Sequence, residues 1–438
     1  MDGDYIAAAK NRRRHLAKHI GDGALILTAA AQVEDFPYRP NPYLYYLSAF
    51  AEPQSALMIV AEGGRVRREV LFCRRRDAEK EKWDGEILGP LRARRMLQIN
   101  ESADIADLPM VLQQTAKEVE AAYYLPGIDA VLELQLSEII AARRSRGSAT
   151  KLWQLRDAAM VLDEMRLVKD AVEIAHIREA ARLTCLGHLA AMRAAAGMTK
   201  KTQGTMREYQ IEAALFAGFK SGGGGHAFLP IIAAGVNACT LHYVNNNALV
   251  RRGQLVLADA GCRWREYAAD VSRTFPVGGV FSAAQKAVYE VVLRAQLSAI
   301  KAVKPDARID AIERAALRVL CQGLRHLGLC RGSVDTIVKK QTYRRFYPHR
   351  VGHFLGLDVH DVGTLKEADG KARKLRKGMV LTVEPGLYIP DDADIPQRLR
   401  RIGVRIEDDV LLTAKGCEVL TAAAPKTPAA IEKWQRGE

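Results

Sequence analysis

The stretch Val250–Phe275, VRRGQLVLADAGCRWREYAADVSRTF, is the starting point for interpreting the whole chain. Its alternating apolar residues predict a β-strand over Gln254–Cys262, a short turn, and a second strand over Arg265–Phe275. Each predicted strand carries one aspartate, Asp259 in the first and Asp270 in the second. The pattern therefore predicts a hairpin that brings two carboxylates close together.

Two aspartates on neighbouring apolar strands need a positively charged or hydrogen-bonding partner. An ionised carboxylate is costly to bury alone, and two of them repel each other. A metal ion between Asp259 and Asp270 would remove both costs. Alternatively, each aspartate could meet an arginine or a backbone N–H group. The hairpin by itself leaves both interpretations open.

The length and composition of the chain describe a soluble two-domain protein. Its 438 residues are too many for one ordinary core. The hydrophobic fraction of 48% and the charged fraction of 26% are typical of globular proteins. No apolar run approaches the roughly 20 residues of a membrane span. We therefore expect no membrane association.

The N-terminus and the cysteines favour a cytoplasmic location. The first residues, MDGDYIAAAKNRRRHLAKHI, carry charges where a signal peptide needs an apolar segment. The seven cysteines are scattered without a C-x-x-C pair, so neither a disulfide framework nor a thiolate zinc site is indicated.

The net charge of +14 raises the question of a nucleic-acid partner. Much of this charge lies in clusters in the first third of the chain: Arg12–Arg14, Arg74–Arg76, Arg92, Arg94, Arg95, Arg143, Arg144 and Arg146. No nucleic-acid-binding motif accompanies them. We expect a solvated basic face, or a surface that meets acidic residues of another subunit, and no nucleic acid.

Residues 1–160 are predicted to form an α/β domain with a mixed sheet. The predicted strands are Ala24–Ala30, Ser55–Ala61 and Glu69–Cys73, and the helical segments are Arg12–Ile20, Ala103–Glu120 and Val131–Arg144. The aromatic stretch Asn41–Phe50 is expected to belong to the core.

Residues 161–438 show the order helix, helix, strands twice. The four helix starts are predicted from capping boxes, in which side chains satisfy the first backbone N–H groups. These boxes are Asp170 with Glu173, Thr205 with Glu208, Ser282 with Gln285, and Asp310 with Glu313. Strands are predicted again at Gly352–His360, Met379–Ile389 and Val404–Leu412. This order suggests an internal duplication.

Local sequence supports the duplication. Arg252–Asp259, RGQLVLAD, parallels Lys377–Glu384, KGMVLTVE, with an acid at the same spacing after the glycine. Each half then supplies a second acid, Asp270 and Glu407. Four acids from two related halves can face each other across a pseudo-two-fold axis, which favours the metal interpretation.

The charge and residue types of this set suggest two divalent metal ions. Four carboxylates carry a charge of about −4, and a dinuclear centre stabilises the attacking and departing oxygens of a displacement together. His349, His353 and His360 lie within the stretch HRVGHFLGLDVHD beside these acids. Mostly oxygen ligands with an imidazole suit manganese, cobalt or zinc better than copper.

Ordered motifs over about residues 165–420 carry a family resemblance. LADAG, SRTFPV, HRVGHFLGLDVHDVG, LTVEPGLYIP and IGVRIEDD resemble the M24 metallopeptidases, and among them the Xaa-Pro aminopeptidases. The segment YYLSAFAEPQSAL is similar to a tyrosine-rich segment of that family's N-terminal domain. The resemblance implies a pita-bread catalytic domain over 161–438 with duplicated halves, preceded by a smaller α/β domain over 1–160.

The resemblance also implies a metal-ligand set. Asp259 would chelate one ion and Asp270 would bridge both. His353 and Glu384 would bind the second ion, and Glu407 would bridge. Glu384 would also shuttle a proton.

The resemblance implies roles for five further side chains. His242 and His360 would hold the scissile peptide and stabilise the charge that develops on its carbonyl oxygen. His349, Tyr388 and Arg405 would line the proline pocket or order the metal ligands.

The implied activity is removal of the N-terminal residue from peptides with proline at the second position. It would use two divalent ions, with manganese expected, in a homodimer or homotetramer. The alternatives are a prolidase, which cleaves Xaa-Pro dipeptides, and a catalytically inactive pita-bread binding protein. The intact ligand set disfavours the inactive protein, and the long first domain disfavours a methionine aminopeptidase.

Two features depart from the family pattern. Arg350 stands where small residues are usual, and the stretch GGGGHAFLPIIAAG lacks the aromatic and serine residues expected near a substrate entrance. These departures bear on substrate preference more than on catalysis.

Overall fold

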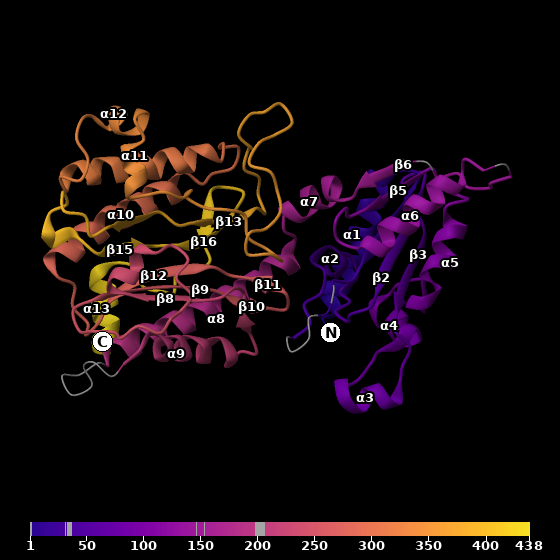
Figure 1. Ribbon diagram of the computed structural model, residues 1–438, viewed down its shortest axis with the longest axis horizontal. Helices are drawn as coiled ribbons and strands as arrows, with labels where there is room; N and C mark the ends of the chain where they lie inside the picture. Colours follow the sequence, from indigo (N-terminus) through magenta and orange to yellow (C-terminus); the bar gives the residue numbers. More distant parts are fainter. Residues whose placement is uncertain (1, 31, 33–36, 146, 153, 198–205) are drawn as a thin grey trace. The chain divides into compact units, whose positions relative to one another are not determined.

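The computed structural model spans residues 1–438 and describes all of them except 1, 31, 33–36, 146, 153 and 198–205 (Figure 1). The chain forms two compact units, Met1–Arg166 and Leu167–Glu438. Among the described residues, every helix is too short or too polar to cross a bilayer.

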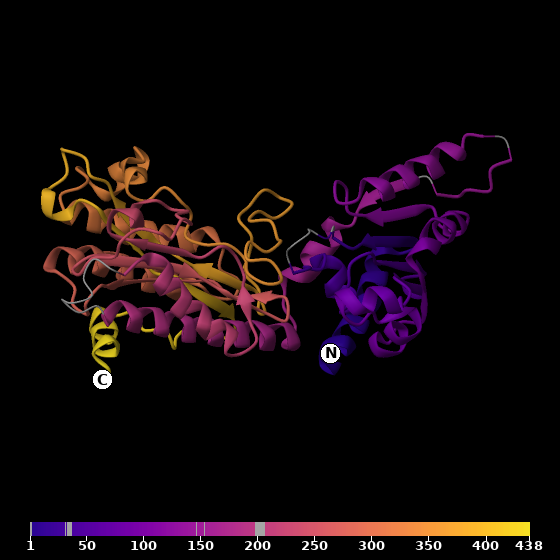
Figure 2. The same ribbon diagram turned by 60° about the horizontal axis from the view of Figure 1, so that its bottom comes forward.

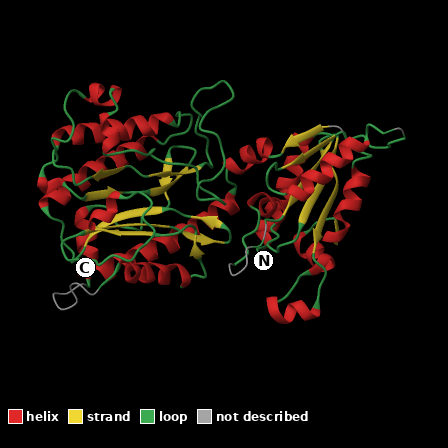
Figure 3. Cartoon of the chain, in the orientation of Figure 1, coloured by secondary structure: helices red, strands yellow, loops and turns green. Residues whose placement is uncertain are grey.

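The first unit contains the expected mixed sheet. Six strands follow the order β4-β3-β2-β1-β5-β6, with antiparallel pairs in the centre and parallel pairs towards both edges. Figure 3 draws the strands of both units in yellow. Their bounds are β1 (Gly23–Thr28), β2 (Ala56–Glu62), β3 (Arg65–Cys73), β4 (Glu101–Asp104), β5 (Ala121–Tyr124) and β6 (Gln154–Asp157). The three strands predicted from the sequence are confirmed.

Helices surround this sheet. Apolar residues of α5 and α6 form a core with alternate residues of β1, β2 and β3, and α1 packs against β2 and β3. The helices are α1 (Gly3–Ile20), α2 (Pro42–Ser48), α3 (Ala78–Asp84), α4 (Gly89–Leu97), α5 (Leu108–Thr115), α6 (Ala130–Ala142) and α7 (Ala159–Leu167). The helix predicted over Ala103–Glu120 is shorter than expected, because its first residues pair with β3 as strand β4.

The first basic cluster is not a solvated face. Arg13 is fully buried and contacts Glu69 at 2.7 Å and the Leu47 carbonyl at 2.8 Å. Arg12 is buried and donates to the Tyr46 carbonyl at 3.0 Å. Two of the arginines therefore hold α1 to the aromatic segment of α2, and only Arg14 of this cluster is exposed.

The second unit contains two helix pairs. Helix α8 (Ala171–Ala196) packs against α9 (Glu208–Lys220), and α10 (Ala283–Ala302) packs against α11 (Asp310–His326). Strands lie between the two pairs, as both views show (Figures 1 and 2). Two shorter helices, α12 (Val334–Lys339) and α13 (Pro428–Arg436), complete the unit.

Two of the predicted capping boxes are confirmed, those of Asp170 with Glu173 and Ser282 with Gln285. The box predicted at Asp310 is wrong, because Asp310 is already the first helical residue of α11. There it contributes an acidic side chain to the first turn, which the helix dipole favours. Thr205 lies outside the described residues.

Each half of the second unit contributes an antiparallel strand pair. In the first half, β9 (Leu255–Ala260) pairs with β12 (Val271–Pro276) and β8 (Ile231–Ala234). In the second, β13 (Val380–Val383) pairs with β16 (Asp408–Leu412), which also pairs with β17 (Cys417–Val419). Two helices followed by an antiparallel pair thus occur twice, as the duplication predicts.

Both hairpins bend where their acids lie. In the first half, the chain leaves β9 and β12 and continues as β10 (Cys262–Trp264) paired with β11 (Tyr267–Ala268) and with β7 (Gly225–His226). In the second half, β14 (Gly386–Ile389) and β15 (Ile402–Arg405) form a separate pair beyond β13 and β16.

Three of the four acids occupy these bends. Asp270 lies between β11 and β12, Glu384 between β13 and β14, and Glu407 between β15 and β16. Asp259 is the last residue but one of β9. The continuous strands predicted through Asp270, Glu384 and Glu407 are therefore wrong, since the chain changes sheets at each of these acids.

The predicted turn of the first hairpin is displaced by two residues. The turn falls at Arg265 and Glu266, which both have positive φ (46° and 68°), as a tight two-residue hairpin turn requires.

The strand predicted over Gly352–His360 is also wrong. Only Phe354 forms a bridge there, to Leu381 of β13, and the chain then closes into a loop through Asp361 N–H to Phe354 C=O at 2.9 Å.

The bend of the first hairpin requires glycine at position 261. A Cβ atom added to Gly261 would lie 1.7 Å from the Ala269 carbonyl oxygen. We expect Gly261→Ala to cost about 1–3 kcal/mol through overpacking. The melting temperature should fall by about 2–4 °C per kcal/mol, measured by differential scanning calorimetry.

Gly416→Ala is the matched control, because a Cβ added there meets nothing within 4 Å. It should leave the melting temperature unchanged. Equal stability of Gly261→Ala and the wild type would contradict the close approach at the bend.

Candidate metal centre

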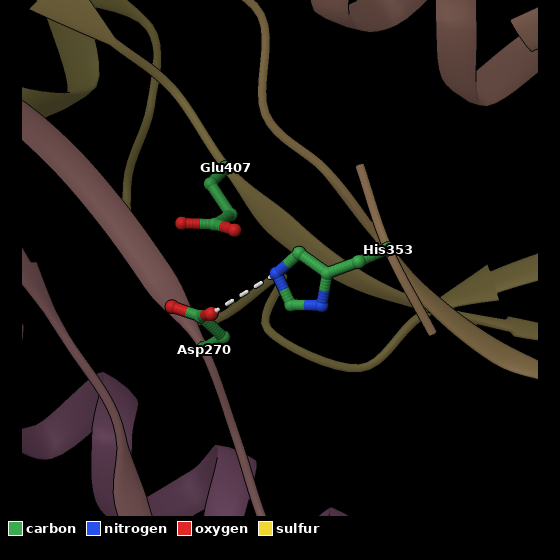
Figure 4. A group of neighbouring side chains, drawn as sticks. All are labelled: Asp270, His353 and Glu407. Atoms are coloured by element: carbon green, nitrogen blue, oxygen red, sulfur yellow. Dashed lines mark ion pairs between the residues drawn. The ribbon is translucent and has the colours of Figure 1, made fainter. Parts of the chain in front are cut away.

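Three predicted ligands form a compact group. Asp270, His353 and Glu407 each offer one ligand atom, and these atoms all lie within 4.8 Å of one another (Figure 4). His353 Nε2 lies 3.5 Å from Asp270 Oδ2. The three side chains come from the bend before β12, the segment beside β13 and the bend before β16, so both halves contribute.

Glu384 and Asp259 adjoin this group. Glu384 Oε1 lies 3.7 Å from His353 Nε2. Asp259 stands opposite Ser272 in the pairing of β9 with β12, two residues from Asp270. The charge of Asp259 raises the pKa of Asp270, of Glu384 and of Glu407. The fold thus groups three of the five predicted ligands, with Glu384 beside His353 and Asp259 on the strand paired with β12.

Without cations, the carboxylates of this cluster would be buried at a cost in free energy and would repel one another. Burial is the main reason why the pKa values of Asp270 and Glu407 lie well above the usual values. The charges of neighbouring carboxylates raise these pKa values further. Burial raises the pKa of Glu384 to about 7, although the charges of His353 and Arg405 oppose this. Cations placed among these carboxylates would offset both the desolvation and the repulsion.

Two buried oxygens test whether a metal fits. Oδ1 of Asp259 and Oδ1 of Asp270 have no hydrogen-bond partner. Buried polar atoms without a partner are rare in proteins and call for an explanation such as a bound ion. Carboxylate oxygens with one imidazole form a donor set for hard to borderline divalent cations. The residues present therefore fit a metal centre.

Arg405 joins the carboxylates to the rest of the site. Its side chain is buried and donates to Asp259 Oδ2 at 2.5 Å, to Ser272 Oγ at 2.8 Å and to the Tyr388 hydroxyl at 2.8 Å. Ser272 Oγ in turn donates to Glu407 Oε2 at 2.9 Å. Asp259 therefore has an arginine partner, which was the alternative to a metal ion. Arg405 contacts Oδ2 of Asp259 and leaves Oδ1 without a partner.

The predicted histidines gather beside the cluster. His349 Nε2 lies 2.8 Å from the Tyr388 hydroxyl, and its Nδ1 lies 3.8 Å from Glu384 Oε2. Burial, with the charge of Arg405, lowers the pKa of His349 to about 4, so its imidazole is neutral at pH 7. The ring of His360 lies 4.3 Å from that of His353.

His242 and His360 are both exposed. The pKa of His360 is lowered by burial and then by the charges of His353 and His242. The charge of His242 also acts on His349. These two exposed histidines are therefore near the cluster and accessible from solvent.

The sequence motifs did not identify a set of charged residues that lies behind the predicted ligands. Asp409 is fully buried, and its two oxygens accept the Asp270 N–H at 3.3 and 3.2 Å. Arg273 and Asp408 are also fully buried and contact each other at 2.7 Å, and Lys426 lies 2.6 Å from Asp408. The alternation of side chains along a strand could have identified Asp408 and Asp409. In an acidic run such as 407–409, successive side chains point to opposite faces of the sheet, so they cannot all face one site.

Comparisons with known proteins agree with this geometry. The model of "Metallopeptidase family M24" matches residues 175–414, and that of "Aminopeptidase P, N-terminal domain" matches residues 9–124. A Xaa-Pro aminopeptidase of Haemophilus influenzae is 41% identical over 91% of this chain and 88% of its own length. The Xaa-Pro aminopeptidase of Escherichia coli is 35% identical over 97% of this chain and 96% of its own length.

Solved structures show the same fold. Aminopeptidase PepP of Pseudomonas aeruginosa superposes with a TM-score of 0.93 at 37% identity, covering 99% of this chain and 98% of that one. Zn-substituted Escherichia coli aminopeptidase P, in complex with product, gives 0.92 at 34% identity with the same coverage. The expected pita-bread fold is thereby confirmed. The chain belongs to the M24 metallopeptidase family.

Proposed function

We propose that this protein is a metal-dependent aminopeptidase that removes the N-terminal residue from peptides with proline at the second position. The observation that carries the proposal is the cluster of Asp270, His353 and Glu407 beside two unpartnered aspartate oxygens. It lies in a chain that resembles Xaa-Pro aminopeptidases over nearly its whole length.

Five residues would hold two divalent ions: Asp259, Asp270, His353, Glu384 and Glu407. Their donor set suits manganese, with cobalt or zinc as alternatives. When bound, such ions make a water molecule nucleophilic near neutral pH and polarise the scissile carbonyl.

Glu384 is the proposed proton carrier. Its carboxylate adjoins both His353 and His349, so it can take a proton from the attacking water and deliver it to the prolyl nitrogen of the departing product. His360, whose ring lies 4.3 Å from that of His353, and the exposed His242 would hold the scissile carbonyl and stabilise the charge on its oxygen.

Proline must be recognised largely by shape, because it has no N–H and its φ is fixed. We assign the recognition of proline to the neutral His349 ring and to Tyr388, which are hydrogen-bonded to each other. Arg405 donates to Asp259, Ser272 and Tyr388, so we assign it to ordering the metal ligands.

We also propose a cytoplasmic homodimer or homotetramer acting on peptides, without a nucleic-acid or membrane partner. The seven cysteines are all free, which is compatible with a reducing compartment. Light scattering coupled to gel filtration measures the assembly.

A comparison of two substrates tests the activity. The manganese-loaded protein should release the first residue from an Xaa-Pro-Yaa tripeptide, and a chelator should abolish the release. An Xaa-Ala-Yaa peptide serves as the control and should be cleaved far more slowly. Turnover of Xaa-Pro dipeptides without turnover of tripeptides would instead identify a prolidase.

Asp270→Asn tests the role of Asp270 as a metal ligand. The amide keeps the shape of the side chain but lacks the negative charge that would help to hold a divalent cation. Activity should fall by more than about 100-fold, the upper end of what the loss of an outer ligand partner costs. Circular dichroism should show a folded protein. Asp369→Asn, at an exposed aspartate, should keep full activity.

Ser272→Ala tests the link between Arg405 and Glu407. Without the hydroxyl, Glu407 loses a donor and Arg405 loses an acceptor. Manganese affinity should fall by about 10-fold, measured by titration calorimetry. Ser298→Ala, which removes a hydroxyl that donates to the Ala315 carbonyl of α11, is the control. Equal affinities in the two variants would refute the link.

A further inference from the structure

Lys169 and Asp361 form an ion pair inside the second unit. Lys169 Nζ lies 2.8 Å from Asp361 Oδ2, and each side chain is only 1% exposed. Lys169 Nζ also donates to the Leu167 carbonyl at 3.4 Å. A buried ion pair adds little to stability, because the cost of removing both charges from water largely offsets their attraction. The retention of this pair therefore needs another explanation.

The ion pair closes the loop that carries His360. This loop, residues 354–361, lies outside the helices and strands and is called the histidine loop below. The Asp361 N–H donates to the Phe354 carbonyl at 2.9 Å, which joins the two ends of the loop. A Cβ atom added to Gly356 would lie 2.3 Å from Asp361 Oδ2 and 3.0 Å from Lys169 Cε. The histidine loop therefore packs directly against the ion pair.

The backbone of Lys169 is fixed at the strand that also holds the start of the loop. The Lys169 N–H donates to the Gly378 carbonyl at 2.9 Å, just before β13. The Leu355 N–H donates to the Val380 carbonyl of β13 at 3.1 Å. Because Lys169 is held in this way, its side chain can fix the position of Asp361 at the other end of the loop.

The middle of the histidine loop is held by the first half of the unit. The Gly356 carbonyl accepts the Ala268 N–H of β11 at 2.9 Å, and the Leu357 carbonyl accepts from Arg263 Nη1 at 2.9 Å. These contacts lie before His360 in the chain, whereas Asp361 follows it directly. The ion pair therefore anchors the backbone on the C-terminal side of His360.

His360 occupies a defined position beside the metal centre. Its ring meets that of His353 edge-on, with centroids 4.3 Å apart and an interplanar angle of 73°. The residue is exposed, so few contacts of its own side chain fix its direction. Movement of its backbone would have to displace Asp361 from Lys169, which would leave two buried charges apart.

We propose that Lys169 and Asp361 are positioning residues for His360: their ion pair fixes the end of the histidine loop, so that the imidazole is in place before the substrate binds. A polar group that is already oriented stabilises developing charge without the cost of reorganisation. The proposal rests on the role of His360 in the proposed function, which is to stabilise the charge on the scissile carbonyl oxygen. Lys169 and Asp361 themselves contact neither substrate nor metal in this scheme.

Lys169→Met combined with Asp361→Asn removes both charges and nearly preserves the size of both side chains. With the Xaa-Pro-Yaa substrate, kcat should fall between about 10-fold and 100-fold, because a small displacement of a catalytic group is enough for such a loss. KM should stay within about twofold. The melting temperature should stay close to that of the wild type, whereas Lys169→Met alone should lower it by leaving the buried Asp361 carboxylate without this cation.

A double-mutant cycle with His360→Ala tests whether the ion pair acts through His360. In the His360→Ala protein, neutralising the pair should lower kcat by less than about twofold, because the imidazole that the pair positions is already absent. Equal losses of kcat with and without His360 would show that the pair acts elsewhere and would overturn the proposal. An unchanged kcat in the neutral-pair variant would overturn it as well.

Hydrogen exchange in the metal-free protein gives a readout that is independent of activity. In the neutral-pair variant, amides of residues 354–361 should exchange at least about tenfold faster than in the wild type, while those of β9 and β12 keep their protection. Unchanged exchange in the histidine loop would show that the pair does not hold it. This measurement separates the positioning role from the choice of substrate.

Arg178→Met combined with Glu418→Gln is the control. It removes an ion pair between α8 and β17 of the same unit, whose side chains are 45% and 43% exposed. Exposed pairs contribute little, so kcat, the melting temperature and the exchange of the histidine loop should all stay unchanged. Failure of the wild type on tripeptides refutes the proposed substrate instead, and the cycle with His360→Ala then runs on the Xaa-Pro dipeptide.

Discussion

The repulsion among buried carboxylates is the constraint on which the catalytic unit depends. Burial raises the pKa values of Asp270, Glu384 and Glu407, and the charge of Asp259 raises all three further. One permanent cation, Arg405, lies among them, buried and donating to Asp259. A single guanidinium cannot balance four carboxylates. The site is therefore built for additional positive charge, which divalent metal ions would supply.

Three of these acids, Asp270, Glu384 and Glu407, lie at bends between strands rather than within a strand. A side chain in a regular strand points to one face of a sheet, whereas a residue at a junction between two sheets can project between them. In the second half Glu384 and Glu407 lie at one junction, between the β13·β16 and β14·β15 pairs. In the first half, Gly261 permits the equivalent bend beside Asp259 and Asp270. Duplication of one bent hairpin thus produces a symmetric set of ligands.

Support behind the ligands comes from hydrogen bonds across the two halves. Ser272 and Thr274 of the first hairpin bond to Glu407 and Arg405 of the second, and Asp409 holds the backbone of Asp270. Ligand geometry and the joining of the halves consequently depend on the same contacts.

The sequence by itself determined the two α/β units, the duplication and the four acids. These follow from local patterns: apolar periodicity, capping residues and a glycine-to-acid spacing repeated 125 residues later. Only the tertiary structure decided where the strands break, which carboxylate oxygens lack partners, that Arg405 joins Asp259 to Tyr388, and that Arg13 is buried. Those properties arise from contacts between residues as far as 146 positions apart, such as Asp259 and Arg405, which no local pattern encodes.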